Sequence, residues 1–320
     1  MSNYMICTRN VIIHENSKNT EFGNEPGKAS FLEVPDDATS FLPSHQLKDE
    51  QVWLNQLLDN NPNAKDILIY IHGYNMSNAD VMKRHKILKA GLQRNGWDGE
   101  LVTFAWPSGT NPVLYWEDRF DAMNVAFELV RSGIKFLVDR INAGCNLNVH
   151  VIAHSTGALI ARESFYYADK TEGTSKSNWS AGQIVFIAGD VSSKSMHGEQ
   201  SDPLYNHSKR FTNYFSNHDS ILSISDGKRL GFENRVGRVG LPVDSSDHSL
   251  DVNCSDYYLQ NKTMLDDAMG DDPAKHPHSW YFWSEMFLQD LVYTLKGELD
   301  RNAIPTRNPI DNNDFSLKTK

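Results

Sequence analysis

The sequence predicts an α/β protein with a mostly parallel, doubly wound sheet that carries helices on both faces. Short apolar runs alternate along the chain with longer amphipathic stretches, which is the pattern of strands joined by crossover helices. The run 67–71 is apolar throughout, as expected for a strand that is covered on both faces. Polar and reactive side chains follow several of these runs directly, at the carboxyl edge where such sheets bind ligands.

The order of the elements follows from the spacing of the apolar residues. We expect strands at residues 4–13, 31–34, 67–71, 101–105, 147–153, 183–188 and 211–216. We expect helices at residues 46–60, 77–93, 117–141, 156–167 and 279–295. Stretches rich in Asn, Gly, Pro and Ser predict loop over most of 14–45 and a polar linker over 169–180.

The length and composition indicate one large domain. The chain has 320 residues, of which 39% are hydrophobic, and this is enough for a sizeable buried core. We interpret residues 1–300 as a single domain and residues 301–320 as a polar C-terminal tail that forms an extended arm. Residues 191–209 are a long polar stretch within the domain, which we consider as a lid or a pocket wall.

The charge and the cysteines restrict the class of partner and the compartment. A net charge of −10 argues against binding nucleic acid through its phosphates. The three cysteines, Cys7, Cys145 and Cys254, are far apart and form no C-x-x-C pair, which favours a reducing compartment. We recognise no signal peptide and no apolar run near the roughly 18 residues of a membrane span. We therefore expect a cytoplasmic protein with a small-molecule partner, and we leave its oligomeric state open.

The most informative stretch runs from Val149 to Ile160. It predicts an apolar strand, a tight turn that carries Ser155, and the start of a helix. Small residues stand two positions before and after the serine, at Ala153 and Gly157, as a nucleophile elbow requires. Alanine replaces the first glycine of the usual G-x-S-x-G pattern, but the turn should still close. The alternative is a serine that only caps the following helix.

A serine nucleophile needs a base, and an acid that orients the base. After an elbow of this kind the acid and then the base follow along the chain. Asp219 is the better acid candidate because it closely follows the strand 211–216, although it would also suit the N-cap of a short helix over 220–225. Asp190, at the end of the preceding strand, is its rival.

Among the twelve histidines, His278 is the best candidate for the base. It lies on a late loop that leads into the last predicted helix. His276 and His248 are its rivals. The alternative for this loop is a metal-binding or merely solvated cluster formed by Asp271, Asp272, His276 and His278. No cysteine or helical pair of ligands supports zinc there, and we expect no metal.

Acyl transfer also needs donors for the developing oxyanion. The backbone N–H groups of Tyr74 and Thr156 are our candidates, because Gly73 lets the chain turn close to the substrate. Further residues at strand ends are candidates for substrate binding, with ordinary core packing as the alternative for the aromatic ones. They are His72, Gly73, Asn75, Trp106, His154 and Trp280, and Tyr115 and Trp116 lie near them in the expected fold.

Several of these pieces together resemble the α/β-hydrolase superfamily and, within it, the DUF900 branch of serine hydrolases of unknown function. The matching segments are Cys7–Asn10, Tyr70–Asn75, Phe104–Gly109, Ala153–Gly157, Asn217–Asp219 and His278–Tyr281. The resemblance covers residues 4–296 and implies a serine nucleophile, an acid after a late strand and a late histidine. Ser155, Asp219 and His278 stand at these positions. Ala153 and the long stretch 191–209 depart from the pattern.

We therefore expect a serine hydrolase, a carboxylesterase that needs no metal or organic cofactor. A thioesterase, an acyltransferase or an amidase would use the same triad. A binding protein on the hydrolase fold is the alternative from another class, although no member of the triad is missing from the sequence.

Overall fold

Ten strands form one sheet within the described residues of the computed structural model, which are 2–14, 19–62, 66–109, 125–134, 148–171, 179–223, 233–270, 277–311 and 314–319. The strands are β1 (Ser2–Ile13), β2 (Thr20–Pro35), β3 (Asp66–Ile71), β4 (Glu100–Ala105), β5 (Asn148–His154), β6 (Ala181–Ile187), β7 (Ser208–Phe215), β8 (Ser249–Asn253), β9 (Arg307–Asp311) and β10 (Asp314–Leu317). Their order across the sheet is β2-β1-β4-β3-β5-β6-β7-β8-β10-β9. All neighbours from β1 to β10 pair in parallel, while β2 and β9 pair antiparallel at the two edges.

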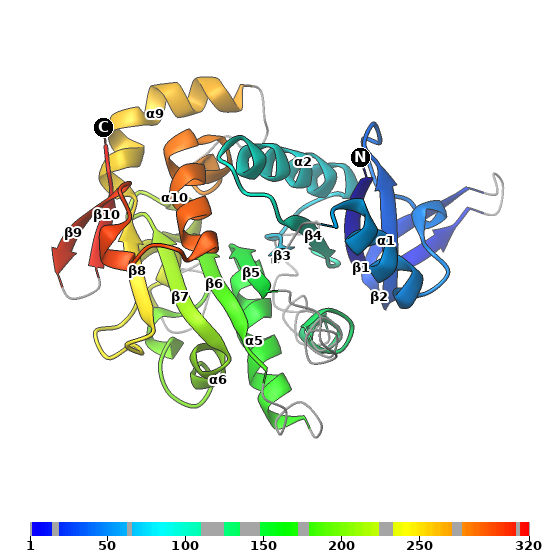
Figure 1. Cartoon of the computed structure of the whole chain (residues 1–320), viewed down its shortest axis with the longest axis horizontal. Coiled ribbons are helices and arrows are strands. Elements are labelled where there is room, and N and C mark those ends of the chain that lie inside the picture. The colour runs from blue at the N-terminus through cyan, green and yellow to red at the C-terminus, as the bar shows by residue number, and fades with distance from the viewer. Residues whose placement is uncertain are drawn as a thin grey trace.

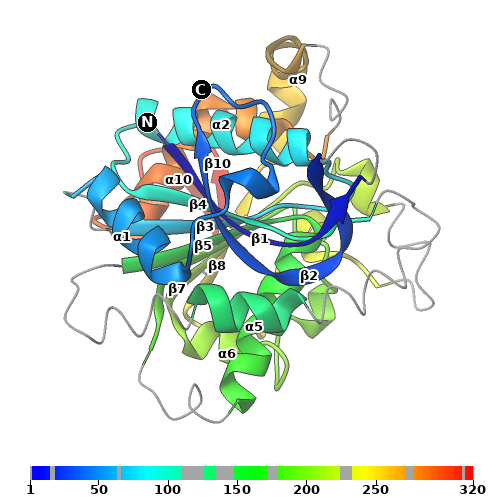
Figure 2. The same ribbon diagram turned by 90° about the vertical axis from the view of Figure 1, so that its right-hand side faces the viewer.

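Helices cover both faces of this sheet (Figures 1 and 2). The helices are α1 (Glu50–Asn60), α2 (Asn78–Arg94), α5 (Thr156–Lys170), α6 (Asp202–Asn206), α8 (Val236–Val239), α9 (Ser255–Met269) and α10 (Glu285–Lys296). Helices α2, α9 and α10 contribute to a core on one face, and α1, α5 and α6 contribute to a core on the other. The predicted fold class is confirmed.

Local sequence explains where several helices begin. The hydroxyl of Ser77 accepts a hydrogen bond from the N–H of Asp80, and the Asp80 carboxylate accepts one from the N–H of Ser77. This capping box satisfies donors that the first turn of α2 leaves free. Asp49 caps α1 and Ser284 caps α10, in each case through one side chain that accepts a hydrogen bond from a backbone N–H of the first turn. The predicted helix 279–295 is therefore two elements, a 3₁₀ turn (Trp280–Trp283) and α10, divided at Ser284.

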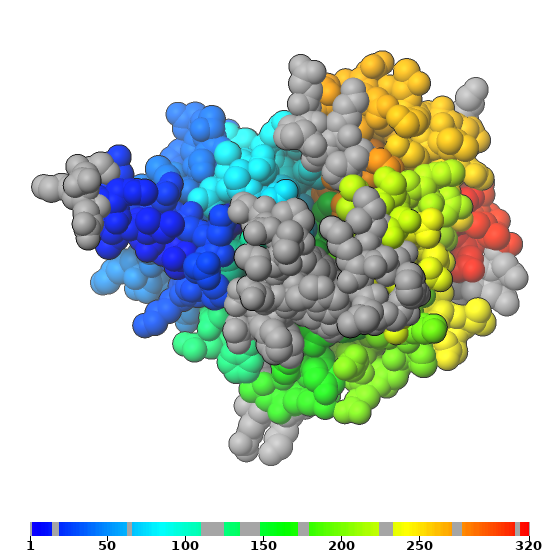
Figure 3. All heavy atoms as spheres, turned by 180° about the vertical axis from the view of Figure 1, so that it is seen from behind, coloured from blue at the N-terminus to red at the C-terminus, as the bar shows by residue number. Residues whose placement is uncertain are grey.

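Several elements in the C-terminal part of the chain were not predicted from the sequence. Strand β8 is only five residues long, and the apolar residues of α9 do not keep to one face, since Leu259 and Met264 are exposed; neither element was predicted. The segment after residue 300 differs from the extended arm that its polarity predicted, because β9 and β10 complete the sheet. Figure 3 shows these last strands in red at the end of the molecule opposite the blue first strands.

The stretch 191–209, considered above as a lid or a pocket wall, contains regular structure. It carries a 3₁₀ turn (Ser193–Ser195) and α6, and it leads from the end of β6 to the start of β7. Met196, Leu204 and Tyr205 are buried in the core on the α5 face. The segment is thus a crossover packed on the core.

Part of the predicted helix 117–141 is described. Residues 125–129 are helical and continue into a π-helical turn, Val130–Ile134. The remainder of that helix, together with Tyr115, Trp116 and Cys145, lies outside the described residues. In the part of the chain that the structure describes, no helix is long and apolar enough to span a membrane.

Candidate active site

Ser155 occupies a strained turn between β5 and α5. Its φ is 56° and its ψ is −125°, a conformation that non-glycine residues rarely adopt outside functional sites. The backbone is held on both sides, because the N–H of Ser155 donates to Ile187 O at 3.1 Å and its carbonyl accepts from Asp190 N at 3.0 Å. The side chain makes no capping hydrogen bond to α5. The serine therefore does not serve as a side-chain cap.

Small residues let this turn pack against the end of β3. A Cβ on Gly157 would lie 2.4 Å from the carbonyl oxygen of Ile71, and a Cβ on Gly73 would lie 2.9 Å from the Cβ of Ser155. Larger side chains would push the two strand ends apart. Ala153 lies fully buried in β5, so alanine is accommodated at the first position of the motif.

Asp219 and His278 form a buried pair. Oδ2 of Asp219 accepts a hydrogen bond from Nδ1 of His278 at 2.6 Å. Oδ1 of the same carboxylate accepts from the N–H groups of Ile221 and Leu222, at 3.1 and 3.0 Å. One carboxylate oxygen of Asp219 therefore faces the histidine, and the other accepts from the backbone of the helical residues that follow. Because Nδ1 carries the proton, Nε2 of the neutral ring is left with the lone pair.

His154 joins the elbow to the loop of His278. Its Nε2 lies 2.9 Å from the carbonyl oxygen of His278, and the centroids of the two rings are 4.7 Å apart. The ring of Phe282 packs edge-on against His154 at 5.2 Å. The residue directly before the nucleophile candidate therefore contacts the residue proposed as the base.

The rival acid Asp190 is paired with an arginine, and the rival base His248 lies at the other edge of the sheet. The carboxylate of Asp190 is buried and ion-paired with Nε of Arg235 at 3.2 Å. His248 is exposed and precedes β8, so it lies at the amino edge of the sheet, away from the elbow. His276 lies outside the described residues, as do Asp271 and Asp272. Among the residues that are described, no group of three or more His, Cys, Asp or Glu side chains could hold a metal ion.

The turn after β3, which carries Gly73, Tyr74 and Asn75, is the candidate oxyanion turn. Asn75 is exposed and has a positive φ of 55°, so the backbone bends sharply here. Gly73 lies against the elbow, and Thr156 begins α5, whose first N–H groups have no partner within the helix. The turn and the helix start thus approach Ser155 from two sides.

Arg9, which the sequence analysis quoted only as part of a motif, supports this turn. Its guanidinium is almost fully buried and donates from Nε to Trp106 O at 3.0 Å and from Nη2 to Met76 O at 2.7 Å. Oγ of Ser108 accepts from Met76 N at 3.1 Å. An arginine two residues after the apolar run 4–7 of a predicted strand was the available signal, since arginine is rarely buried without partners.

Three predicted substrate contacts are instead packing residues. The side chains of His72, Trp106 and Trp280 are fully buried. His72 donates from Nδ1 to Gly73 O and accepts at Nε2 from Trp106 N, with its ring stacked on that of Trp106. Burial, with the nearby charge of Arg9, lowers the pKa of His72 to about 3. Trp280 packs among aromatic rings, namely those of Tyr257, Tyr258, Tyr281 and Phe287.

A serine in a strained strand–turn–helix, with a later aspartate–histidine pair, defines the class of α/β-hydrolases. The chain belongs to the family described as "Alpha/beta hydrolase of unknown function (DUF900)", which matches residues 46–249. The resemblance inferred from the sequence is confirmed. No curated protein matches the chain.

Solved structures that are similar to this chain include hydrolases. A dienelactone hydrolase from Anabaena variabilis shares 13% identity at a TM-score of 0.35, over 78% of this chain and 88% of its own. A phospholipase PlaB from Legionella pneumophila, solved in complex with thio-NAD, shares 14% identity at a TM-score of 0.28, over 59% of this chain and 37% of its own.

Proposed function

We propose that this hydrolase cleaves carboxylic esters through an acyl-enzyme intermediate formed on Ser155. The observation that carries the proposal is the 2.6 Å contact between Asp219 and His278, brought to the elbow by the contact between His154 and the His278 carbonyl. A buried carboxylate that holds Nδ1–H leaves Nε2 as a base directed at a serine hydroxyl.

In the proposed reaction Oγ of Ser155 attacks the acyl carbon while His278 takes its proton. His278 then gives this proton to the leaving alcohol, and in the second half it activates water in the same way. Asp219 keeps the ring in the required tautomer and stabilises the imidazolium. No metal or organic cofactor takes part.

The backbone N–H groups of Tyr74 and Thr156 are proposed to bind the oxyanion. Thr156 is the first residue of α5, so the positive end of the helix dipole also favours negative charge at this point. Arg9 donates a hydrogen bond to the carbonyl of Met76, and Ser108 accepts one from its N–H, and these two bonds hold the turn that carries Tyr74. Gly73 and Asn75 remain candidates for the edge of the substrate site.

The same triad would serve a thioesterase, an acyltransferase or an amidase, and substrate tests must separate these. The strain at Ser155 supports a functional role for this residue. A positive φ at a serine costs free energy, and such strain persists mainly where function requires it.

The first test is hydrolysis of p-nitrophenyl esters, from acetate to palmitate, by the wild type and by Ser155→Ala. We expect turnover to be abolished in Ser155→Ala with the fold retained, because the variant lacks the nucleophile. The matched control is Ser164→Ala, which removes a buried hydroxyl within α5 and should keep its activity. Near-native turnover by Ser155→Ala would refute the mechanism.

Labelling with a fluorophosphonate distinguishes an active serine from an idle one. We expect a single adduct, mapped to Ser155 by mass spectrometry. Labelling without ester turnover would direct the search to thioesters, amides or acyl transfer, while the absence of labelling would favour a binding protein.

A further inference from the structure

We infer that His154 is a positioning residue that sets the location of His278 relative to Ser155. The inference rests on the proposed function and deepens it. It reassigns His154, which the sequence placed in the substrate site, to the support of the base.

The geometry defines the direction of the contact. A carbonyl oxygen only accepts, so Nε2–H of His154 donates to the backbone oxygen of His278 at 2.9 Å. Both residues are almost completely buried, with 6% of His154 and 5% of His278 exposed. In such surroundings a satisfied hydrogen bond restricts its partners more strongly than it would in water.

This bond is a short path between nucleophile and base. His154 is the residue that precedes Ser155. The elbow is therefore connected to the backbone of His278 by one peptide unit, the side chain of His154 and one hydrogen bond. The ring contact of 4.7 Å limits the tilt of the His278 ring, and Asp219 holds the ring from its Nδ1 side. His278 is therefore fixed at its backbone by His154 and at its ring by Asp219.

Other side chains hold the His154 ring and the segment after His278. Phe282 packs edge-on against His154, and the guanidinium of Arg84 on α2 lies over the rings of Phe282 and Trp283, at 4.3 and 4.6 Å from their centroids. A Cβ on Gly73 would lie 3.1 Å from Nδ1 of His154. The ring thus has little room to leave its contact with His278.

Two variants separate the hydrogen bond from the ring. His154→Phe keeps an aromatic ring and removes the donor, whereas His154→Gln keeps an N–H donor at similar reach and removes the ring. We expect His154→Phe to lower kcat for esters and the rate of fluorophosphonate labelling about tenfold, the effect of one lost hydrogen bond. We expect KM to stay unchanged and His154→Gln to recover most of the rate. His154→Met is the second donor-free variant if the Phe variant does not fold.

His150→Phe is the matched control for loss of a buried histidine from the same strand. His150 lies near the start of β5, where its Nδ1 accepts from Gln183 N, and it does not belong to the site. We expect this control to change thermal stability without changing the labelling rate of the folded protein. If His154→Phe reacts with fluorophosphonate at the wild-type rate, the inference is overturned. If His154→Phe and His154→Gln lose the same fraction of the labelling rate, the effect does not come from the hydrogen bond.

A readout without turnover keeps this inference separate from the proposed function. The Nδ1–H proton of His278, bonded to Asp219, should give a far-downfield proton NMR signal. We expect this signal to shift or broaden in His154→Phe and to be kept in His154→Gln and His150→Phe. If the wild type fails to react with esters and fluorophosphonate, the proposed function fails, and this signal still decides whether His154 positions His278. An unchanged signal in His154→Phe would contradict the inference.

Discussion

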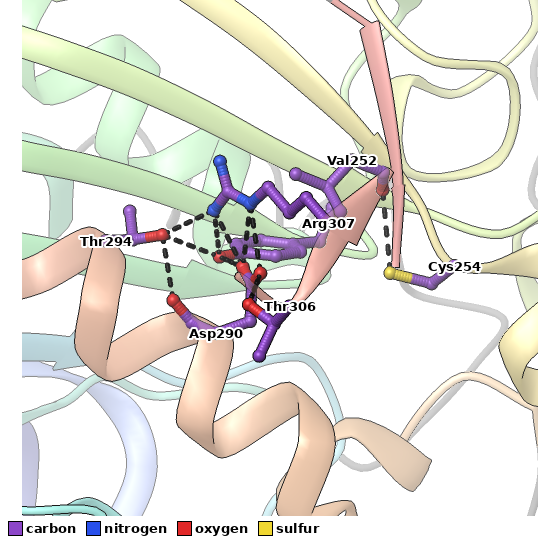
Figure 4. A network of polar contacts seen from close by, with 7 residues as sticks. Val252, Cys254, Asp290, Thr294, Thr306 and Arg307 are labelled. Atoms are coloured by element: carbon purple, nitrogen blue, oxygen red, sulfur yellow. Dashed lines mark hydrogen bonds and ion pairs between the residues drawn. The ribbon is translucent and has the colours of Figure 1, made fainter. Parts of the chain in front are cut away.

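Two buried carboxylates, Asp219 and Asp290, show how the same chemical group can serve different purposes in one fold. Both are completely buried. Asp219 bonds one histidine ring and two backbone N–H groups. Asp290 on α10 instead accepts from the guanidinium of Arg307, with Nη2 at 2.7 Å, and from Oη of Tyr214 at 2.6 Å (Figure 4).

The difference lies in whether the partner can exchange a proton. Burial acts to lower the pKa of Arg307, but the charge of Asp290 outweighs it and holds that pKa above its usual range. Burial and Asp290 also raise the pKa of Tyr214. Both shifts oppose loss of the proton from Arg307 and from Tyr214, and the cluster joins β9 and α10 to β7. Asp219 faces an imidazole, the side chain best suited to gain and lose a proton near neutrality.

The largest effect is expected from Asp219→Asn. The amide oxygen can still accept from the backbone of Ile221 and Leu222, so the loop should keep its shape. The amide nitrogen would face Nδ1 of His278 and favour the wrong tautomer, and we expect a loss of about 10⁴-fold in kcat. Steady-state kinetics would measure the loss in kcat, and thermal unfolding would show whether the fold is retained. A loss below about tenfold would remove Asp219 from the proposed triad.

Arg307→Met is expected to lower the stability of the protein and to leave the reactivity of Ser155 unchanged, whereas Asp219→Asn should do the reverse. Arg307→Met leaves the charge of Asp290 buried without its cation, and we expect the free energy of unfolding to fall by about 3–5 kcal/mol. Urea denaturation would measure this. The variant should react normally with fluorophosphonate while it is folded, because the pair does not touch the elbow.

The double variant Asp290→Leu with Arg307→Met is the control for this interpretation. Removal of both charges should recover about 2 kcal/mol relative to Arg307→Met, although Tyr214 and Thr306 lose an acceptor. If the double variant is no more stable than the single one, the uncompensated charge is not the cause of the loss.

A third buried carboxylate, Asp251 on β8, sharpens the comparison because it accepts hydrogen bonds from two neutral donors, Asn213 and the N–H of Leu241. Burial raises its pKa from 3.8 to about 7, against these two bonds. Between these values the folded protein holds a proton that the unfolded chain releases. Stability should therefore fall as pH rises from about 4 to 7, by at most roughly 1.4 kcal/mol per pH unit.

This slope should be smaller in Asp251→Asn, which has no group to titrate at that position. Unfolding by urea across this pH range would measure it, with the slope and not the absolute stability as the readout. An unchanged slope in the variant would assign the pH dependence to other groups.

Local signals predicted much of the fold. The run 67–71 and the elbow around Ser155 were predicted because each depends on neighbours in the chain, and the capping box at Ser77, found in the structure, is equally local. β8 was missed because its central Asp251 is polar yet buried through bonds to distant groups. Strands β9 and β10 were not predicted because an arginine such as Arg307 is expected on the surface, and only its contact with Asp290 allows it to be buried.

The candidate site divides in the same way. The strand–turn–helix at Ser155 was determined by the sequence itself, because small residues at Ala153 and Gly157 allow the sharp turn whatever surrounds it. Only the tertiary structure decided that His278 pairs with Asp219, which is 59 residues away, while Asp190 pairs with Arg235. It also moved His72, Trp106 and Trp280 into the core and gave His154 a partner. Partners and burial depend on which distant segments meet, and this is settled by the packing of the whole sheet rather than by neighbours in the chain.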